Sequence, residues 1–355
     1  FQIIDWGLPN DTHMYTYCYD EYQYLSALSD MDYKNFDFDP NRPKDTHGPV
    51  YFTGAVIMIG DILGFYNIGD EVYYKENLDQ WINVIKFLRI CWGKVPLLLL
   101  QLVSFFIGKI LINSRFGLFF AAVIGFLPGF FINSNFAVES IMIVLLTAIV
   151  YLLTIMFIRR PNVRYLYWAS FIVGLATSIK APGILCPIFI LSAILIKKKD
   201  IDENMIKILI MSGFLMFTGF ALTSPYNIKF MFYKLFLPGN EYVNDVSVQK
   251  DTLVNIFKFD FPFLFWNIIG IIKTFFLQLC GLLFLFIPVG IFYRHKDKSY
   301  QISYYYMIGF VCISIFVMYA SNYRLLPMVY FLALYSMTGC YSMLKEIKNT
   351  FVKAA

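Results

Sequence analysis

Two adjacent carboxylates, Asp20 and Glu21, are the residues of this sequence best placed to do chemistry. They lie in a mostly polar segment, residues 5–48, whereas nearly everything after Arg89 is apolar. Ionisable groups are costly inside lipid, so a membrane protein usually keeps its chemistry in the polar part that it holds against the bilayer. A carboxylate in such a place can act as a general base and deprotonate a hydroxyl group.

The composition predicts an all-α polytopic membrane protein. Of the 355 residues, 59% are hydrophobic and 15% are charged, and the mean hydropathy is +0.61. Soluble domains are about 45–50% apolar and about 25% charged. Long apolar runs exclude a transmembrane barrel, whose segments are short and alternating. The net charge of +5 comes from lysines and arginines clustered between apolar runs. We interpret these clusters as topology signals and predict no nucleic-acid partner.

The pattern divides the chain into three parts. Residues 1–4 resemble the end of a first transmembrane helix whose beginning lies upstream, residues 5–93 form an external catalytic loop with juxtamembrane helices, and residues 94–355 form a bundle of about nine transmembrane helices. An external loop near 226–263 interrupts the bundle. The predicted spans are 94–112, 116–133, 138–158, 164–181, 184–196, 206–224, 264–292, 303–320 and 325–343.

Basic residues favour the cytoplasmic side and so predict the orientation. Four clusters are placed inside: Arg159-Arg160 with Arg164, Lys197 to Lys199, Arg294 with Lys296 and Lys298, and Lys345 with Lys348 and Lys353. Two spans then separate residue 89 from residue 133, so residue 89 lies outside. The apolar run 50–66 is short of the roughly 20 residues that a span needs and contains Asp61. We predict that it is a surface or re-entrant helix.

This topology places acids and cations from distant parts of the chain on one face of the membrane. A carboxylate can activate an acceptor hydroxyl, and cations can hold a leaving phosphate and stabilise its growing charge. Transfer from an anionic lipid donor needs both. The set consists of Asp20, Glu21, His47, Arg89, Glu139, Lys180, Tyr323 and Arg324.

Six short motifs in a fixed order carry a resemblance to a known superfamily. They are Trp6-Gly-Leu-Pro9 with Asp20-Glu21-Tyr22, His47-Gly-Pro-Val-Tyr51, Leu88-Arg89, Ser134-Asn-Phe-Ala-Val-Glu139, Gly174-Leu-Ala-Thr-Ser-Ile-Lys180 and Asn322-Tyr-Arg-Leu-Leu-Pro327. The sequence resembles the GT-C membrane glycosyltransferases that use polyprenyl-phosphate sugars, in particular the protein O-mannosyltransferase and aminoarabinose-transferase branch. No single motif is specific, and the resemblance rests on their order along most of the chain.

The resemblance implies an inverting sugar transfer at the outer face of the plasma membrane. Asp20 would be the base and Glu21 its partner. The donor phosphate would contact Arg89, Lys180 and Arg324, and the substrates would contact His47, Glu139 and Tyr323. The acceptor is open between protein, lipid and glycan. Some relatives bind a divalent metal and others none; residues 133–140 lack a DxD motif, so we expect no obligatory metal or cofactor, with a divalent cation as the alternative.

Three departures from the family pattern leave the sugar and the acceptor open. Tyr19 stands where members often have proline, Gly48 replaces a proline, and Glu139 stands where aspartate is commoner. Taken alone, Asp20-Glu21 fits an ordinary helix N-terminus, where acids favour the helix dipole. Arg89 alone fits an interfacial residue, and Lys180 alone fits a helix C-terminus.

Two other functions compete with glycosyl transfer. A polyprenol or lipid-linked-sugar transporter would show repeated halves and ionisable residues near the membrane midplane. The sequence shows no internal repeat, and its ionisable residues gather at one boundary. A membrane scaffold without activity gives no reason for an Asp-Glu pair opposite three distant cations.

Overall fold

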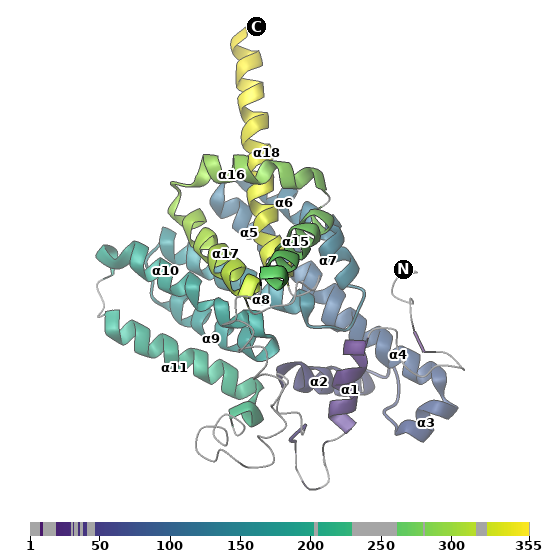
Figure 1. Cartoon of the computed structure of the whole chain (residues 1–355). Coiled ribbons are helices and arrows are strands. Elements are labelled where there is room, and N and C mark those ends of the chain that lie inside the picture. The colour runs from purple at the N-terminus through teal and green to yellow at the C-terminus, as the bar shows by residue number, and fades with distance from the viewer. Residues whose placement is uncertain are drawn as a thin grey trace.

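The computed structural model describes residues 8–9, 19–29, 31, 35, 38–40, 47–201, 205–228, 261–279, 281–316 and 325–354 (Figure 1). This part of the chain is 85% helical and contains no strand. Three of its helices are long and apolar enough to cross a membrane, or four if one bent pair counts as a single span. The all-α class predicted from composition is therefore confirmed for these residues, and the helices are those of a helical membrane protein.

The helices have the following bounds in chain order. They are α1 (Tyr19–Ser29), α2 (Gly48–Ile62), α3 (Glu71–Glu76), α4 (Leu78–Arg89), α5 (Val95–Leu111), α6 (Ser114–Phe126), α7 (Pro128–Asn133), α8 (Ser140–Arg159), α9 (Arg164–Ile179), α10 (Pro187–Lys197), α11 (Met205–Thr223), α15 (Phe261–Gln278), α16 (Ile287–Arg294), α17 (Lys298–Phe316) and α18 (Leu326–Ala354). Short 3₁₀ turns occupy Ala181–Leu185, Lys198–Asp200 and Gly281–Phe286, and a π-helical turn, called the π-turn below, occupies Ile90–Lys94.

The π-turn joins α4 and α5 into one continuous helix of 34 residues, Leu78–Leu111. At 1.5 Å per residue this helix is about 51 Å long, well beyond the roughly 30 Å hydrocarbon core of a bilayer. Its second half is the apolar run predicted to begin at residue 94, and its first half carries the polar face of α4. The helix is therefore longer than a perpendicular span needs, and its polar half carries Arg89 at its end.

The hairpin of α8 and α9 separates an acid–lysine pair from a cluster of arginines by about the thickness of a membrane's hydrocarbon core. α8 has 20 residues, about 30 Å, and begins directly after Glu139, while α9 ends directly before Lys180. The opposite end of the hairpin carries Arg159, Arg160 and Arg164. Glu139 and Lys180, predicted to contact the substrates and the donor phosphate, thus lie at the end of the hairpin away from this basic cluster.

Three of the four basic clusters meet at that other end. Arg294 lies over the Tyr300 ring at 5.7 Å from its centroid, and Arg159 also acts electrostatically on Tyr300. Lys298 in turn acts on Asp200, which accepts a bond from Lys197 at 2.7 Å. These three clusters therefore share one end of the bundle, which agrees with their placement on one side in the predicted orientation.

Paired glycines let three helix pairs approach closely. Gly174 and Gly219 join α9 to α11, Gly108 and Gly117 join α5 to α6, and Gly290 and Gly339 join α16 to α18; a Cβ on any of the six would collide with the backbone of the partner helix. In lipid the hydrophobic effect does not drive helices together. Their association depends instead on van der Waals contacts, which small residues make possible by letting the backbones approach closely.

The helices α1 to α4 form a separate small layer against the α8–α9 end of the bundle, at the lower right of Figure 1. Val56 of α2, Leu88 of α4 and Trp92 of the π-turn are buried together with Ile143 of α8 and Ile179 at the end of α9. α2 has 15 residues, about 22 Å, which is too short for a perpendicular span. A surface or re-entrant position for residues 50–66, as predicted, agrees with this length.

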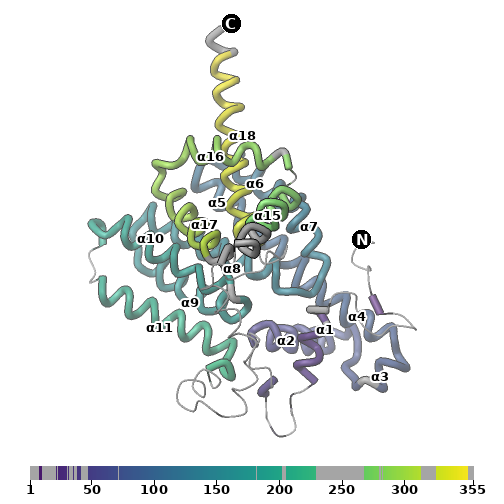
Figure 2. The backbone as a smooth tube through the Cα atoms, viewed as in Figure 1, coloured from purple at the N-terminus to yellow at the C-terminus, as the bar shows by residue number. Residues whose placement is uncertain are grey.

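Several predicted spans are broken in the structure. Leu127 is extended before Pro128, which splits the run 116–133 into α6 and α7, because proline disfavours a helical conformation in the preceding residue. The run 264–292 bends by 104° between α15 and α16, next to Gly281 with φ +48°. In the run 184–196 the α-helix begins only at Pro187, after a 3₁₀ turn, and α10 has 11 residues. The number of nine spans stays a prediction. The tube trace in Figure 2 follows the breaks along the chain.

We expect the two ends of the α8–α9 hairpin to lie on opposite sides of the membrane. In a background without native cysteines, Glu76→Cys of exposed α3 should react with an impermeant thiol reagent added to intact cells, because α3 belongs to the layer at the Glu139 end. Lys199→Cys, equally exposed, should react only after permeabilisation. Labelling of both from the same side would contradict the arrangement.

Candidate functional site

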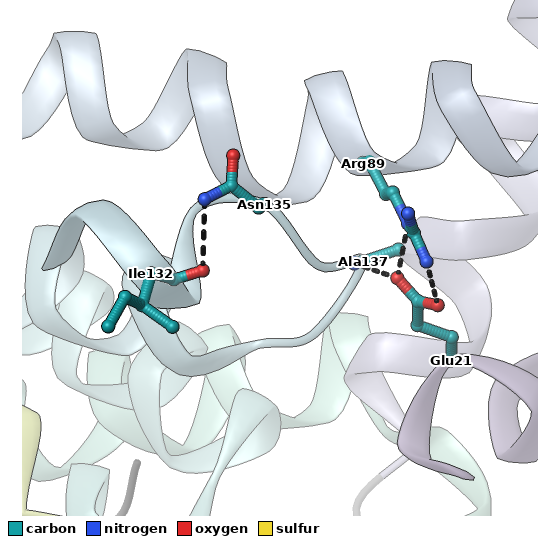
Figure 3. A network of polar contacts seen from close by, with 5 residues as sticks. All are labelled: Glu21, Arg89, Ile132, Asn135 and Ala137. Carbon is teal, nitrogen blue, oxygen red and sulfur yellow. Dashed lines mark hydrogen bonds and ion pairs between the residues drawn. The ribbon is translucent and has the colours of Figure 1, made fainter. Parts of the chain in front are cut away.

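The connection between α7 and α8, residues 134–139, is the point where the distant predicted residues meet. We call it the 134–139 loop. Its start is held by the end of α7: Asn135 Nδ2 donates to the carbonyls of Phe131 at 2.8 Å and Ile132 at 3.3 Å, and Ser134 Oγ donates to Phe131 at 2.8 Å. Figure 3 shows this loop between the helix that carries Arg89 and the helix that carries Glu21. The loop is therefore fixed before α8 begins.

Glu21 and Arg89 form a buried two-pronged ion pair on this loop. Arg89 Nε donates to Glu21 Oε1 and Arg89 Nη2 donates to Glu21 Oε2, each at 2.9 Å (Figure 3). The backbone N–H of Ala137 donates to the same Oε1 at 2.7 Å. Both side chains of the pair are 0% exposed. One carboxylate thus joins α1, the end of α4 and the 134–139 loop.

The geometry of this pair offsets the cost of burying it. Removing two charges from water costs several kcal/mol per ion, and only good geometry with further hydrogen bonds compensates. Here the planar guanidinium matches both carboxylate oxygens, and the Ala137 N–H adds a charge-assisted bond. The Arg89 guanidinium also lies 5.7 Å from the centroid of the Phe136 ring. A buried pair of this kind fixes the relative position of its elements.

A second ion pair lies on the same loop. Lys180 Nζ bonds Glu139 Oε1, and the Tyr24 hydroxyl donates to Glu139 Oε2. Tyr24 and Glu21 are three residues apart on α1, so they share one face of that helix. The Lys180 and Glu139 side chains are 14% and 8% exposed, so this pair is more accessible than the first. α1 therefore holds the loop at two points.

Trp92 of the π-turn holds α1 and α2 in register with the loop. Its ring stacks on Tyr24 with centroids 6.0 Å apart and meets Phe52 edge-on at 4.5 Å. Its Nε1 donates to Thr53 Oγ1 of α2 at 3.0 Å, which satisfies the buried indole N–H. The Tyr24 hydroxyl is thereby aimed at Glu139 by packing on its ring.

His47 is completely buried beside the end of α9. Its backbone N–H donates to Asn227 Oδ1 at 3.2 Å, and its ring meets Tyr51 edge-on. The next residue, Gly48, lies so close to α9 that a Cβ would come within 2.6 Å of the Ser178 carbonyl oxygen. A proline at this position would need space that Ser178 occupies, which is a physical reason for the glycine.

The π-turn brings a further lysine to the loop. Lys94 Nζ donates to Asn135 Oδ1 at 2.6 Å and to Ser134 Oγ at 3.2 Å, and lies 5.3 Å from the centroid of the Phe131 ring. Gly93 lies against the Ser134 carbonyl, with no space for a Cβ. π-turns are rare in helices and often occur at functional sites.

The predicted site residues fall into two groups. Glu21, His47, Arg89, Glu139 and Lys180 lie around the 134–139 loop and the adjoining end of α9; contact shows their proximity, and their chemical roles stay predictions. The structure does not describe the position of the others. Asp20 belongs to α1, but its side chain lies outside the described residues, and so do Tyr323, Arg324, residues 1–4 and most of the 226–263 loop.

Two residues at the loop were not predicted, although each has a recognisable signal in the sequence. Tyr24 stands three residues after Glu21, the spacing that places it on the same helix face. Lys94 directly precedes the apolar run of α5, a boundary position where a lysine is placed to meet polar groups.

Within the described residues there is no group of three or more His, Cys, Asp or Glu side chains that could hold a metal ion. The expectation of no obligatory metal stays a prediction. A scan of protein-family models and a search of curated proteins found no match to this chain.

We expect removal of either member of the Glu21–Arg89 pair to destabilise the protein. Glu21→Gln and Arg89→Met should each lower the free energy of unfolding by about 3–5 kcal/mol, because each leaves a buried group without its partner. The double variant should be less destabilised than the sum of the two. Unfolding in mixed micelles, followed by circular dichroism, measures this.

Asp79→Asn on the exposed face of α4 is the matched control and should change the unfolding free energy by no more than about 0.5 kcal/mol. Additive effects of Glu21→Gln and Arg89→Met would contradict an interacting pair.

Proposed function

We propose that this protein transfers a sugar from a polyprenyl-phosphate donor to an acceptor on the outer face of the plasma membrane, with inversion at the anomeric carbon. In this step a carboxylate takes the proton of the acceptor hydroxyl. The acceptor oxygen forms a bond to the anomeric carbon while the bond from that carbon to the phosphate oxygen breaks. The leaving group is the polyprenyl phosphate, and cations stabilise its charge.

The observation that carries the proposal is the meeting of two ion pairs on the 134–139 loop. In the first pair Glu21 and Arg89 are 68 residues apart, and in the second Glu139 and Lys180 are 41 residues apart. The Ala137 N–H, 116 residues from Glu21, joins the first pair to the loop. They gather at the end of the α8–α9 hairpin opposite three basic clusters, where the predicted orientation has the outer face. The order of the six motifs supports the same function.

The difference in burial favours a different role for each of the two ion pairs. Glu21 and Arg89 are fully buried and bound to each other, which suits positioning of α1 and of its neighbour Asp20. Asp20 is the proposed base. Lys180 and Glu139 are partly accessible, which suits contact with the donor phosphate and orientation of the acceptor. Tyr323 and Arg324 keep their proposed substrate and phosphate roles from the motif alone.

We expect Asp20→Asn to abolish sugar transfer without loss of folding or membrane insertion, because the change removes the base and almost no volume. Membranes containing the protein would be supplied with radiolabelled polyprenyl-phosphate mannose or aminoarabinose, and label leaving the donor would be counted. Asp79→Asn is the control and should transfer as the parent does.

Transfer by Asp20→Asn at a rate near that of the parent would eliminate Asp20 as the base. Movement of intact donor across the bilayer, without cleavage of its sugar by the parent, would favour the transporter.

A further inference from the structure

The cations around the 134–139 loop differ in how their charge is compensated. Arg89 is bound to Glu21 and Lys180 is bound to Glu139. Lys94 contacts only neutral oxygens and an aromatic ring, and within the part of the chain that the structure describes no carboxylate lies within ion-pair distance of its Nζ. Lys94 therefore brings a positive charge to the loop that these residues leave without a counter-charge.

Ser134 Oγ and Asn135 Oδ1, called the cradle below, hold the Lys94 ammonium group and leave one of its N–H donors unused. An ammonium group has three donors, and Ser134 Oγ and Asn135 Oδ1 accept from two of them. These two oxygens are fixed because Ser134 and Asn135 donate to the carbonyls at the end of α7. The cradle thus holds the charge in one place and leaves one donor for a ligand.

The π-turn creates this arrangement. In an α-helix, residues five apart lie about 140° apart around the axis, whereas the wider π-turn brings them closer to one face. Arg89 and Lys94 are five apart and both reach the loop. Gly93 permits this approach, since any side chain there would push against the Ser134 carbonyl.

Exposed apolar side chains lie around Lys94 on its helix. Ile90 and Val95 on either side of it are 41% and 44% exposed, and Leu98 one turn further is 65% exposed. These side chains belong to the 34-residue helix at the point where its apolar half begins. A lysine at the boundary between the polar and the apolar half of such a helix is suited to the headgroup layer, where lipid phosphates are the abundant anions.

We propose that Lys94, in the cradle of Ser134 and Asn135, binds a phosphate group carried by a membrane lipid. A polyprenyl phosphate and a phospholipid headgroup offer the same chemistry. The identification of the lipid as the polyprenyl-phosphate donor rests on the proposed function; the phosphate site itself does not. If the lipid is the donor, Lys94 binds the donor phosphate together with Lys180.

We expect Lys94→Met to weaken binding of undecaprenyl phosphate to the purified, detergent-solubilised protein by about tenfold or more, because a charge-assisted contact is lost. Lys94→Arg should bind within a few-fold of the parent. Gly93→Ala should also weaken binding, because it displaces the cradle and leaves Lys94 intact. Lys109→Met, an exposed lysine on the same helix, is the control and should bind as the parent does. Thermal unfolding of each variant establishes that it is folded.

Parallel titrations with phosphatidylglycerol and inorganic phosphate identify the source of the phosphate. Lipid binding that depends on Lys94 supports the site, whichever lipid binds more tightly. Equal affinity of the parent and Lys94→Met for all three probes overturns the site, and inorganic phosphate binding as tightly as both lipids overturns its assignment to a lipid. Loss of lipid binding in Lys94→Met without sugar transfer from any donor would leave the site standing and reject the transferase. Transfer that is insensitive to Lys94→Met would do the reverse.

Discussion

The buried pair of Glu21 and Arg89 is the interaction on which the arrangement of the polar end depends. It connects three segments that the chain keeps far apart: α1, the end of α4 and the 134–139 loop. None of these has a large apolar core of its own, so a strong directional contact defines their relative positions. An ion pair without access to water keeps its strength, since neither salt nor solvent screens it. The more exposed Glu139–Lys180 pair is then held at a defined distance from it.

The helices of the bundle hold this end at a defined distance from the basic clusters. The α8–α9 hairpin carries acids and a lysine at one tip and arginines at the other, with about 30 Å of apolar helix between. Glycine pairs bring α11 onto α9 and α6 onto α5 at backbone distance, which limits sliding of the helices. The small layer of α1 to α4 packs on the tip of this hairpin through Trp92 and its neighbours. The geometry of the polar end therefore depends on helix packing at a distance from it.

The sequence predicted the parts that depend on local pattern. Apolar runs predicted the helical class, and basic clusters predicted which helix ends lie together. Of the segments named by the motifs, those of Glu21, Arg89 and Lys180 meet around the 134–139 loop, whereas the segment of Arg324 stays a prediction. The spacing of residues did not predict that Arg89 binds Glu21, because a pairing across 68 positions depends on the tertiary fold. The break before Pro128 and the bend near Gly281 were missed because hydropathy alone does not register a change of backbone direction.

The π-turn amounts to a single extra residue wound into a long helix. Removing one residue between Arg89 and Lys94 would restore ordinary α-helical winding, and everything upstream would rotate by about 100° relative to α5. The helix would remain continuous and equally apolar, yet Arg89 would no longer face the loop that Lys94 faces. Two chains of this type that differ by one residue here would have nearly the same hydropathy profile and differently built polar ends.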